Sequence, residues 1–203
     1  MFENNYRNRI SDIMKKIELV YREILFNSIE KKRRTLTQKE LAEKLNISLS
    51  TVNHAMKPLR KMGSVRIKKR SFEVVNVKKI LYYWASVRNI DRDIIYFTRI
   101  EKSASQIEKS MPQGVEFACY SAYKFKFNDV PADYNEVYIY SNNSEEIKKR
   151  FPEKKGPPNL FVLKKDFDKV TIAQIFVDLW NLKEWYAKEF MKSMEERLHG
   201  ILA

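Results

Sequence analysis

The chain has 203 residues and a formal net charge of +13, and its 44% hydrophobic and 13% aromatic residues are enough to bury a core. Four glycines, two histidines and one cysteine are too few for glycine-rich phosphate loops, zinc fingers or an internal disulfide. No apolar run approaches the roughly 18 residues of a membrane span. We therefore expect a cytoplasmic protein with no metal, no cofactor and no membrane contact.

Positive charge is concentrated in the first 78 residues. Up to Lys78 the sequence contains 19 Lys and Arg against 8 Asp and Glu, whereas residues 79–203 contain 20 against 18. This asymmetry favours an anionic partner for the first part, although an ordinary solvated basic surface is the alternative. We place the domain boundary here, with one domain over residues 1–78 and a second over residues 79–203.

Two short helices are predicted after a long first helix over residues 8–29, whose far end could pack on a partner subunit. Thr37 and Glu40 have the spacing of a capping box at the start of the first short helix. Asn46 and Ile47 form the turn, and Ser48 is a good N-cap for the next helix. A capped helix, a tight turn and a second capped helix are typical of a helix-turn-helix.

The second short helix is amphipathic, and its polar face has the residue types that a helix in a DNA groove needs. Short polar groups can approach base edges, and cations can meet phosphates. Pro58 predicts a kink or a new turn, which limits the groove-facing part mainly to residues 48–57. The apolar face consists of Val52, Ala55, Met56, Leu59 and Met62. The opposite face consists of Ser50, His54, Lys57 and Lys61, with Asn53 on its flank.

A two-stranded hairpin is predicted directly after this helix. Gly63 is a natural residue to end the helix, in the position that favours a left-handed backbone. Residues 64–68 and 72–75 alternate like strands around a polar turn. Such a hairpin is a wing, and Lys68, Lys69 and Arg70 at its tip are placed to meet a phosphate or the minor groove.

Residues 37–53 resemble the winged helix-turn-helix regulators of bacteria and archaea. Thr51, Val52, Leu59, Gly63 and Val65 belong to the same resemblance, which covers about residues 17–76. The resemblance implies binding to double-stranded DNA. The residues predicted to contact it are Thr37, Gln38, Ser48, Ser50, Thr51, Asn53, His54, Lys57, Lys61, Lys68, Lys69 and Arg70.

The second domain mixes strands and helices, so the fold class expected for the whole chain is α+β. Thr171 and Gln174 have capping-box spacing and predict one long helix that continues almost to the end. Its wide apolar face suggests packing on two sides, or on a sheet and a dimer partner. The other expected helices cover residues 77–89, 120–127 and 144–150, and the expected strands cover residues 94–98, 115–118, 136–140 and 160–163.

A weaker resemblance links this domain to nucleotidyltransferase folds, which carry Gly-Ser and then Asp-x-Asp about a dozen residues later. Tyr120 stands in place of the glycine before Ser121, and Asn135 in place of the second acid after Asp133. The adjacent Glu136 would point to the opposite strand face, so a two-metal site is poorly supported. A winged helix joined to such a degenerate domain resembles the antitoxin regulators of abortive-infection AbiE systems, as does the segment 177–179.

The leading hypothesis is a sequence-specific transcriptional regulator that binds double-stranded DNA as a homodimer and is not an enzyme. One alternative is an antitoxin-like interaction protein that neutralises a partner through the second domain. Another is a nucleotidyltransferase that uses Asp133 and Glu136. The second domain could also bind a small effector in an aromatic-lined pocket, or serve only for dimerisation.

Overall fold

The computed structural model describes the backbone of residues 2–202 and the side chains of residues 15–200. The chain divides into two compact units, one formed by residues up to Val87 with those from His199 onward, and one by Arg88–Leu198. The predicted boundary at residue 78 differs from this division by the length of one helix. No helix in the described part of the chain has both the length and the apolar character that a membrane span requires.

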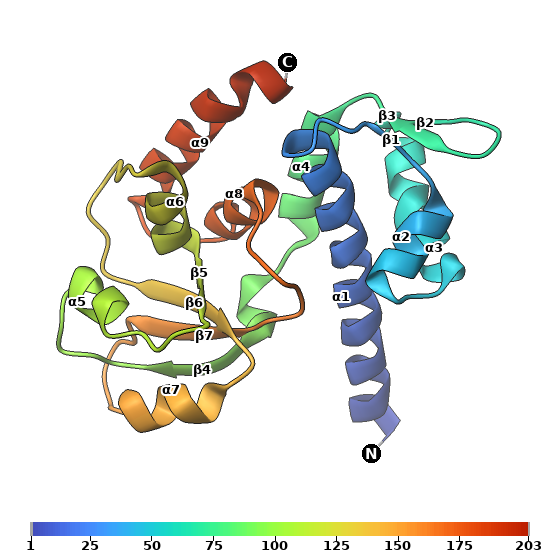
Figure 1. Ribbon diagram of the computed structural model, residues 1–203. Helices are drawn as coiled ribbons and strands as arrows, with labels where there is room; N and C mark the ends of the chain where they lie inside the picture. The colour runs from blue at the N-terminus through green and yellow to red at the C-terminus, as the bar shows by residue number, and fades with distance from the viewer. Residues whose placement is uncertain (1, 203) are drawn as a thin grey trace. The chain divides into compact units, whose positions relative to one another are not determined.

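The first unit packs three helices and a small sheet around a long helix (Figure 1). All three strands pair antiparallel in the order β1-β3-β2. The helices are α1 (Phe2–Ile29), α2 (Gln38–Leu45), α3 (Leu49–Lys61) and α4 (Val77–Val87). The strands are β1 (Thr35–Leu36), β2 (Val65–Ile67) and β3 (Phe72–Val74).

Helix α1 is the centre of this unit because its apolar face contacts both α3 and α4. Val20, Ile24 and Leu25 on α1 are fully buried. The indole N–H of Trp84 on α4 donates to Glu18 on α1 at 3.0 Å, which fixes α4 to the first unit. The helix begins earlier than the predicted residue 8, and the side chains before residue 15 lie outside the described residues.

The second unit is built on a four-stranded mixed sheet in the order β4-β7-β6-β5. The central pair β6 and β7 is parallel, and the two outer pairs are antiparallel. The strands are β4 (Ile94–Thr98), β5 (Glu116–Ala118), β6 (Val137–Ser141) and β7 (Leu160–Lys164). The helices are the short 3-10 helix η1 (Ile90–Asp93), α5 (Ala104–Lys109), α6 (Cys119–Phe127), α7 (Ser144–Arg150), α8 (Ile172–Trp180) and α9 (Ala187–Leu202).

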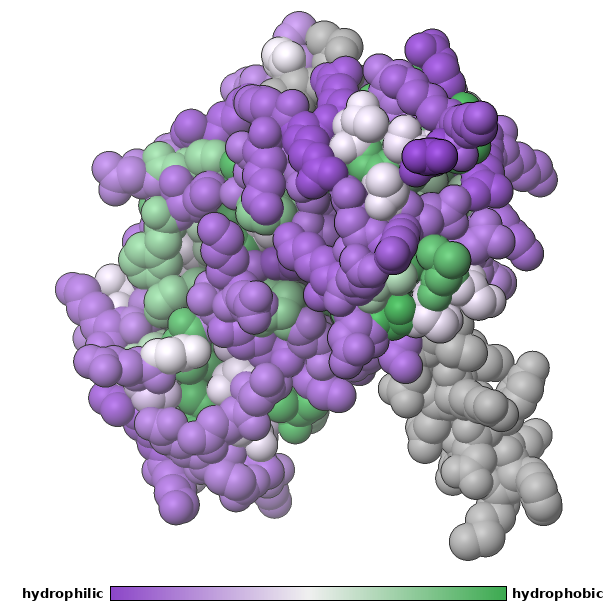
Figure 2. Space-filling view, turned by 45° about the vertical axis from the view of Figure 1, so that its right-hand side comes forward, coloured by the Kyte–Doolittle hydropathy of each residue, from purple (hydrophilic) through white to green (hydrophobic). Residues whose placement is uncertain are grey.

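Helices cover both faces of this sheet, with α6 and α8 on one side and α7 on the other (Figure 1). On the α7 side, Ile147 and Phe151 pack with Ile139 and Val162 of the central strands and with Ile107 of α5. The exterior seen in Figure 2 is mostly hydrophilic, with apolar side chains in separate small patches. A winged helix-turn-helix followed by this sheet and the final helix confirms the α+β class.

The prediction of one long helix from Thr171 almost to the end is wrong, because two helices occupy this segment. Thr171 does cap α8, since its hydroxyl accepts from the Gln174 N–H at 3.2 Å. The side-chain amide of Asn181 then donates to the Val177 carbonyl at 2.9 Å and ends α8. The interruption places Tyr186 and Phe190 against the ring of Tyr120 on α6, at 5.2 and 4.9 Å between centroids. Tertiary packing of aromatic rings therefore overrides the helical periodicity.

Helix α5 is not among the helices predicted from the sequence, although a local signal for it exists. Ser103 accepts from the Gln106 N–H, and the Gln106 side chain accepts from the Ser103 N–H, which completes a capping box. The Ser-x-x-Gln spacing could have identified this helix start. The helix has only six residues, too few for a recognisable apolar period.

An ionic cluster is buried in the second unit between η1, α8 and β6. The Asp178 carboxylate accepts from Tyr140 at 2.7 Å, from Gln174 at 2.9 Å and from Arg88 at 3.3 Å. Arg88 also pairs with Asp93. Burial raises the pKa of Asp178, and the Arg88 charge and the three hydrogen bonds oppose that shift. Burial removes the hydration of these charged groups, and their ion pairs and hydrogen bonds offset that cost.

Candidate nucleic-acid interface

Helix α2, the first helix of the helix-turn-helix, is capped at both ends. Thr37 is the N-cap of α2, and its hydroxyl accepts from the Glu40 N–H at 3.0 Å. The Glu40 carboxylate accepts from Arg33 at 2.7 Å, in place of the backbone contact expected of a capping box. At the other end Asn46 adopts a left-handed backbone, φ 50°, which asparagine tolerates better than most residues. The Ile47 N–H then donates to the Ala42 carbonyl at 3.0 Å and closes the turn.

The recognition helix α3 begins at the predicted cap. The Ser48 hydroxyl accepts from the Thr51 N–H at 3.0 Å and lies 2.8 Å from the Thr51 hydroxyl. Both hydroxyls are therefore already engaged in the first turn, while the exposed Ser50 is in no such bond within the described residues. Gln38, at the first position of α2, is half-buried.

Burial divides α3 into the two predicted faces. Val52, Ala55, Met56 and Leu59 have no exposed surface, and together they anchor α3 on α1. The helix contains no acidic residue. Its solvent face is therefore neutral near the start and positive toward the end. The exposed side chains on that face are Ser50, Asn53, His54, Lys57, Arg60 and Lys61.

Several cations near this face are not neutralised by the protein. Lys57, Lys61, Lys69 and Arg70 make no ion pair or side-chain hydrogen bond among the described residues, and neither does His54. An unpaired exposed cation retains its full charge for a phosphate oxygen.

The helix continues through Pro58 to Lys61, so Pro58 does not end it, and the groove-facing limit near Lys57 stays a prediction. The Pro58 carbonyl still accepts from the Met62 N–H at 3.0 Å. Arg60 was not among the predicted contact residues, yet its guanidinium donates to the Asn53 side chain at 3.2 Å. A separation of seven residues places two side chains on the same helix face, and this spacing was the available signal.

Gly63 directs the chain from α3 into the wing. It has φ +67°, and its N–H donates to the Arg60 carbonyl at 3.0 Å. The Ser64 N–H donates to the Leu59 carbonyl at 3.0 Å, which completes a Schellman motif and confirms the predicted helix end.

The wing is a short antiparallel hairpin whose inner residues Val65, Phe72 and Val74 are buried. The Lys68 N–H donates to the Ser71 carbonyl at 2.9 Å, so the exposed tip consists of Lys69 and Arg70.

Lys68 differs from the other predicted wing residues because it is paired. Its ammonium lies 3.0 Å from the Glu73 carboxylate, and Arg66 lies 3.7 Å from the same group. The hydrogen bond and charge of Lys68, with smaller contributions from Arg66 and Arg34, lower the pKa of Glu73. Glu73 therefore stays ionised and offsets part of the positive charge at the base of the wing.

The interface also exposes two apolar side chains that were not predicted. Leu49 begins α3 and is 55% exposed, and Ile67 precedes the wing tip and is 49% exposed. An aliphatic side chain at a groove-facing position can contact the thymine methyl group.

The nucleotidyltransferase-like positions of the second unit lie near one another, because Ser121 and Tyr134, the neighbour of Asp133, both donate to Glu108. Ser121 is buried and donates to Glu108 at 2.7 Å, and the Tyr120 hydroxyl donates to Glu184 at 3.1 Å. Glu136 accepts from Tyr186, while Asp133 is exposed. Among the described residues, no group of three or more His, Cys, Asp or Glu side chains could hold a metal ion.

Comparison with known proteins agrees with the geometry of the first unit. Residues 22–66 match a family model described as winged helix-turn-helix DNA-binding. No curated protein sequence and no solved structure matches the chain. The matched segment runs from α1 through α2 and α3 into β2. The chain therefore carries a winged helix-turn-helix DNA-binding domain over residues 22–66.

Proposed function

We propose that this protein is a sequence-specific transcriptional regulator that binds double-stranded DNA. The observation that carries the proposal is the solvent face of α3, where polar groups precede unpaired cations and no carboxylate is present. Such a face is complementary to a groove floor lined by hydrogen-bonding groups and flanked by phosphates.

The proposed docking places α3 in the major groove, which is wide enough for a helix. Asn53 and His54 would meet base edges, since an asparagine amide can make two hydrogen bonds to adenine. Lys57 and Lys61 would contact the flanking phosphates. Lys69 and Arg70 at the wing tip would reach the backbone or the minor groove.

We further propose that the protein acts as a homodimer on two half-sites. A two-fold dimer of helix-turn-helix units reads half-sites about one helical turn of DNA apart. Exposed apolar side chains in the second unit support a role in assembly: Phe97 is 58% exposed and Trp185 is 72% exposed.

The same exposed side chains favour a second candidate, an antitoxin-like protein that neutralises a partner through the second unit. This function is compatible with DNA binding, because the two roles would use different units. Affinity purification of the tagged protein from its native cells tests it. A partner that is retained by the parent and lost from Trp185→Ala supports this candidate, whereas a surface used only for self-assembly would retain none.

We also propose that the chain is not an enzyme. The hydrogen bond from Ser121 to Glu108 and the hydrogen bond from Tyr186 to Glu136 support this, because both engage the nucleotidyltransferase-like positions in contacts within the protein. Incubation with labelled nucleoside triphosphates and Mg²⁺ tests it, and label transfer that Asp133→Ala abolishes would contradict it.

The experiment that tests DNA binding uses fluorescence anisotropy. A duplex enriched by the full chain from a random pool is compared with a shuffled duplex at two salt concentrations. We expect tight binding to the enriched duplex that survives the higher salt, and weak, salt-sensitive binding to the shuffled duplex.

Variants of the full chain locate the interface. Asn53→Ala and His54→Ala should reduce the preference for the enriched duplex, by about 1–3 kcal/mol for a residue that pairs directly with a base. Lys188→Ala, on the exposed surface of α9, is the control and should bind like the parent. Unchanged preference in both α3 variants would mean that α3 does not read the bases. Failure of the parent to bind either duplex at low salt would overturn the proposed function.

A further inference from the structure

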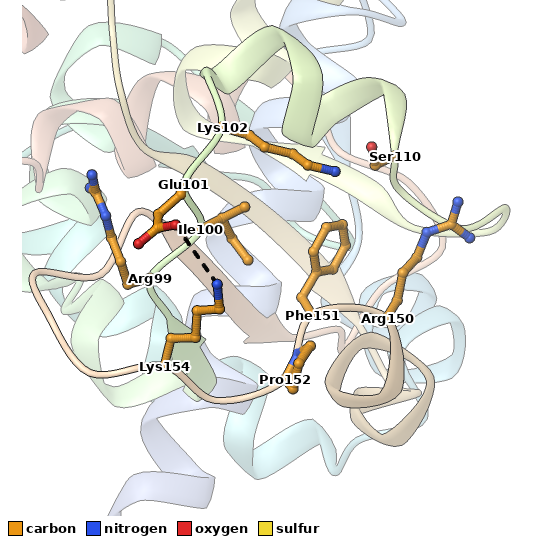
Figure 3. Close-up of a pocket in the computed structure, with 9 residues that line it drawn as sticks. All are labelled: Arg99, Ile100, Glu101, Lys102, Ser110, Arg150, Phe151, Pro152 and Lys154. Atoms are coloured by element: carbon orange, nitrogen blue, oxygen red, sulfur yellow. Dashed lines mark ion pairs between the residues drawn. The ribbon is translucent and has the colours of Figure 1, made fainter.

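A basic cavity of about 500 Å³ lies in the second unit, remote in sequence from the winged helix (Figure 3). It is lined by the connection from β4 to α5, by Ser110 just after α5, and by the end of α7 with the loop that follows. Four cations line it, Arg99, Lys102, Arg150 and Lys154, together with Ser110, whose hydroxyl donates to the Gln106 carbonyl at 2.8 Å. Its volume is within the range of small-molecule sites, about 300–1,000 Å³.

The charge of this cavity is largely unbalanced. Glu101 is the one acidic residue among those lining it, and its carboxylate is 4.0 Å from Lys154. Arg99, Lys102 and Arg150 make no ion pair or side-chain hydrogen bond among the residues that the structure describes. Residues 79–203 together have a net charge of only +2, so these cations form a local concentration of charge and not part of a uniformly basic surface.

Hydrogen bonds hold both walls of the cavity in place. The Thr98 hydroxyl donates to the Pro152 carbonyl at 3.1 Å and accepts from the Lys154 N–H at 2.9 Å. The Asn159 side chain accepts from the Ile100 N–H at 2.7 Å and donates to the Ile100 carbonyl at 2.9 Å. The backbone that carries the cations is therefore fixed before any ligand arrives, which lowers the entropic cost of binding.

The floor of the cavity is apolar. Ile100 and Phe151 are 9% and 4% exposed, and both belong to the core on this face of the sheet. Figure 3 shows Lys102 reaching toward Ser110, with Arg150 on the same side and Lys154 on the other. Charged donors around an apolar floor can surround a compact anion from several directions.

We propose that this cavity binds a small ligand that carries one or more phosphoryl groups. Guanidinium and ammonium groups are the donors that phosphate oxygens prefer. Lys102 and Arg150 are the principal phosphate contacts, and Lys154 is recruited from Glu101 when the ligand adds negative charge. A cavity of about 500 Å³ with an apolar floor suits a small phosphorylated molecule better than an extended nucleic-acid backbone.

The test measures binding of inorganic phosphate, pyrophosphate and ATP to the full chain by isothermal titration calorimetry. We expect pyrophosphate or ATP to bind more tightly than inorganic phosphate, because more oxygens meet the cations. In Lys102→Ala/Arg150→Ala, the affinity should fall by about tenfold or more, as expected for the loss of charge-assisted hydrogen bonds. Both residues are exposed, and thermal unfolding of the variant should match the parent.

The matched control is Lys69→Ala/Arg70→Ala, which removes two exposed cations from the wing and changes the net charge equally. It should leave pyrophosphate binding unchanged. Equal losses in the two double variants would indicate nonspecific attraction to a basic protein and would overturn the proposal, as would no binding of any of the three ligands by the parent.

Duplex binding by the same variants separates the two possible sources of phosphate. We expect the cavity variant to bind DNA like the parent. If it loses DNA affinity as strongly as the wing variant, the cavity contacts nucleic-acid phosphates and the small-ligand proposal is wrong. Because pyrophosphate binding is measured without DNA, failure of the proposed regulatory function does not affect this outcome.

Discussion

The guanidinium of Arg60 donates a hydrogen bond to the side-chain oxygen of Asn53, 3.2 Å away and two turns earlier on α3. The contact uses the side-chain oxygen of Asn53 and does not involve its NH₂ group. Arg60 also adds a positive charge to the face that we propose for the major groove. Because Pro58 does not end the helix, the two residues stay on one continuous surface.

The Asn53–Arg60 pair should behave as one unit in DNA recognition. Asn53→Ala and Arg60→Ala should each weaken binding to the enriched duplex, and the double variant should lose less than the sum of the two. A coupling of about 1 kcal/mol is expected for a hydrogen-bonded pair of this kind. Anisotropy titrations of the four proteins measure this coupling. His54→Ala combined with Arg60→Ala is the control pair, and equal coupling in both pairs would contradict a specific contact.

The wing tip should contribute affinity without sequence preference. Removing the unpaired cations in Lys69→Ala/Arg70→Ala should weaken binding to all duplexes alike. The slope of log affinity against log salt should become shallower by about 1.8, close to 0.9 for each lost phosphate contact. Lys188→Ala/Lys192→Ala on α9 removes the same charge and should leave the slope unchanged. A wing variant that lost preference but kept its slope would show that the tip reads bases.

Glu73 should weaken DNA binding by the wing, because its carboxylate pairs with Lys68 and Arg66. Glu73→Gln releases these cations, so we expect tighter, less selective DNA binding and a steeper salt dependence. The control is Glu43→Gln on α2, an exposed acid paired with Lys39 at 3.7 Å. Titrations of both variants against a shuffled duplex measure the effect, and equal gains in the two would point to net charge alone.

Stability should depend on pH through the buried Asp178. Its pKa is raised in the folded state, so the native protein binds this proton more tightly than the unfolded chain does. The stabilisation that protonated Asp178 contributes is complete below the ordinary Asp pKa of 3.8. It is lost as pH rises through the raised pKa of the folded state. The free energy of unfolding of the parent, relative to that of Asp178→Asn, should therefore fall as pH rises.

Urea unfolding from pH 3 to 7 measures this difference. Glu73→Gln gives the opposite trend, because the pKa of Glu73 is lowered by Lys68 in the folded state. The stability that this carboxylate contributes is present above its ordinary value and is lost as pH falls through the lowered one. Parallel pH profiles for the two variants would contradict the assignment of both groups.

A side chain at Gly63 should lower the free energy of unfolding. Gly63→Ala places a Cβ at φ +67°, where an L residue is strained, although no neighbouring atom lies within 4 Å of that Cβ. We expect a loss of about 1–2 kcal/mol in unfolding free energy. Gly200→Ala, in helix α9 with equally open surroundings, should instead stabilise by up to about 1 kcal/mol. Thermal unfolding of both variants distinguishes backbone strain from crowding, and a loss in both would contradict this assignment.

The sequence by itself determined the helix-turn-helix and its wing, because their signals are local. Thr37 and Ser48 cap their helices, Asn46 and Gly63 adopt the left-handed turns, and the apolar period of α3 matches its burial. Each of these depends on residues within four or five positions of one another, so the chain alone specifies them. The strands of the second unit were found for a similar reason, since runs of β-branched and aromatic residues mark them.

Tertiary structure decided what depends on residues distant along the chain. Packing on Tyr120 divides the predicted final helix into α8 and α9, although its apolar period continues through the break. The fold brings Arg99 and Lys102 to the same cavity as Arg150, about 50 positions later, and no local pattern marks that encounter. The pairing of Lys68 with Glu73 follows from strand register, which decides which wing cations remain free. Periodicity and capping act within a few residues, whereas charge pairing and cavities arise only when separate segments meet in space.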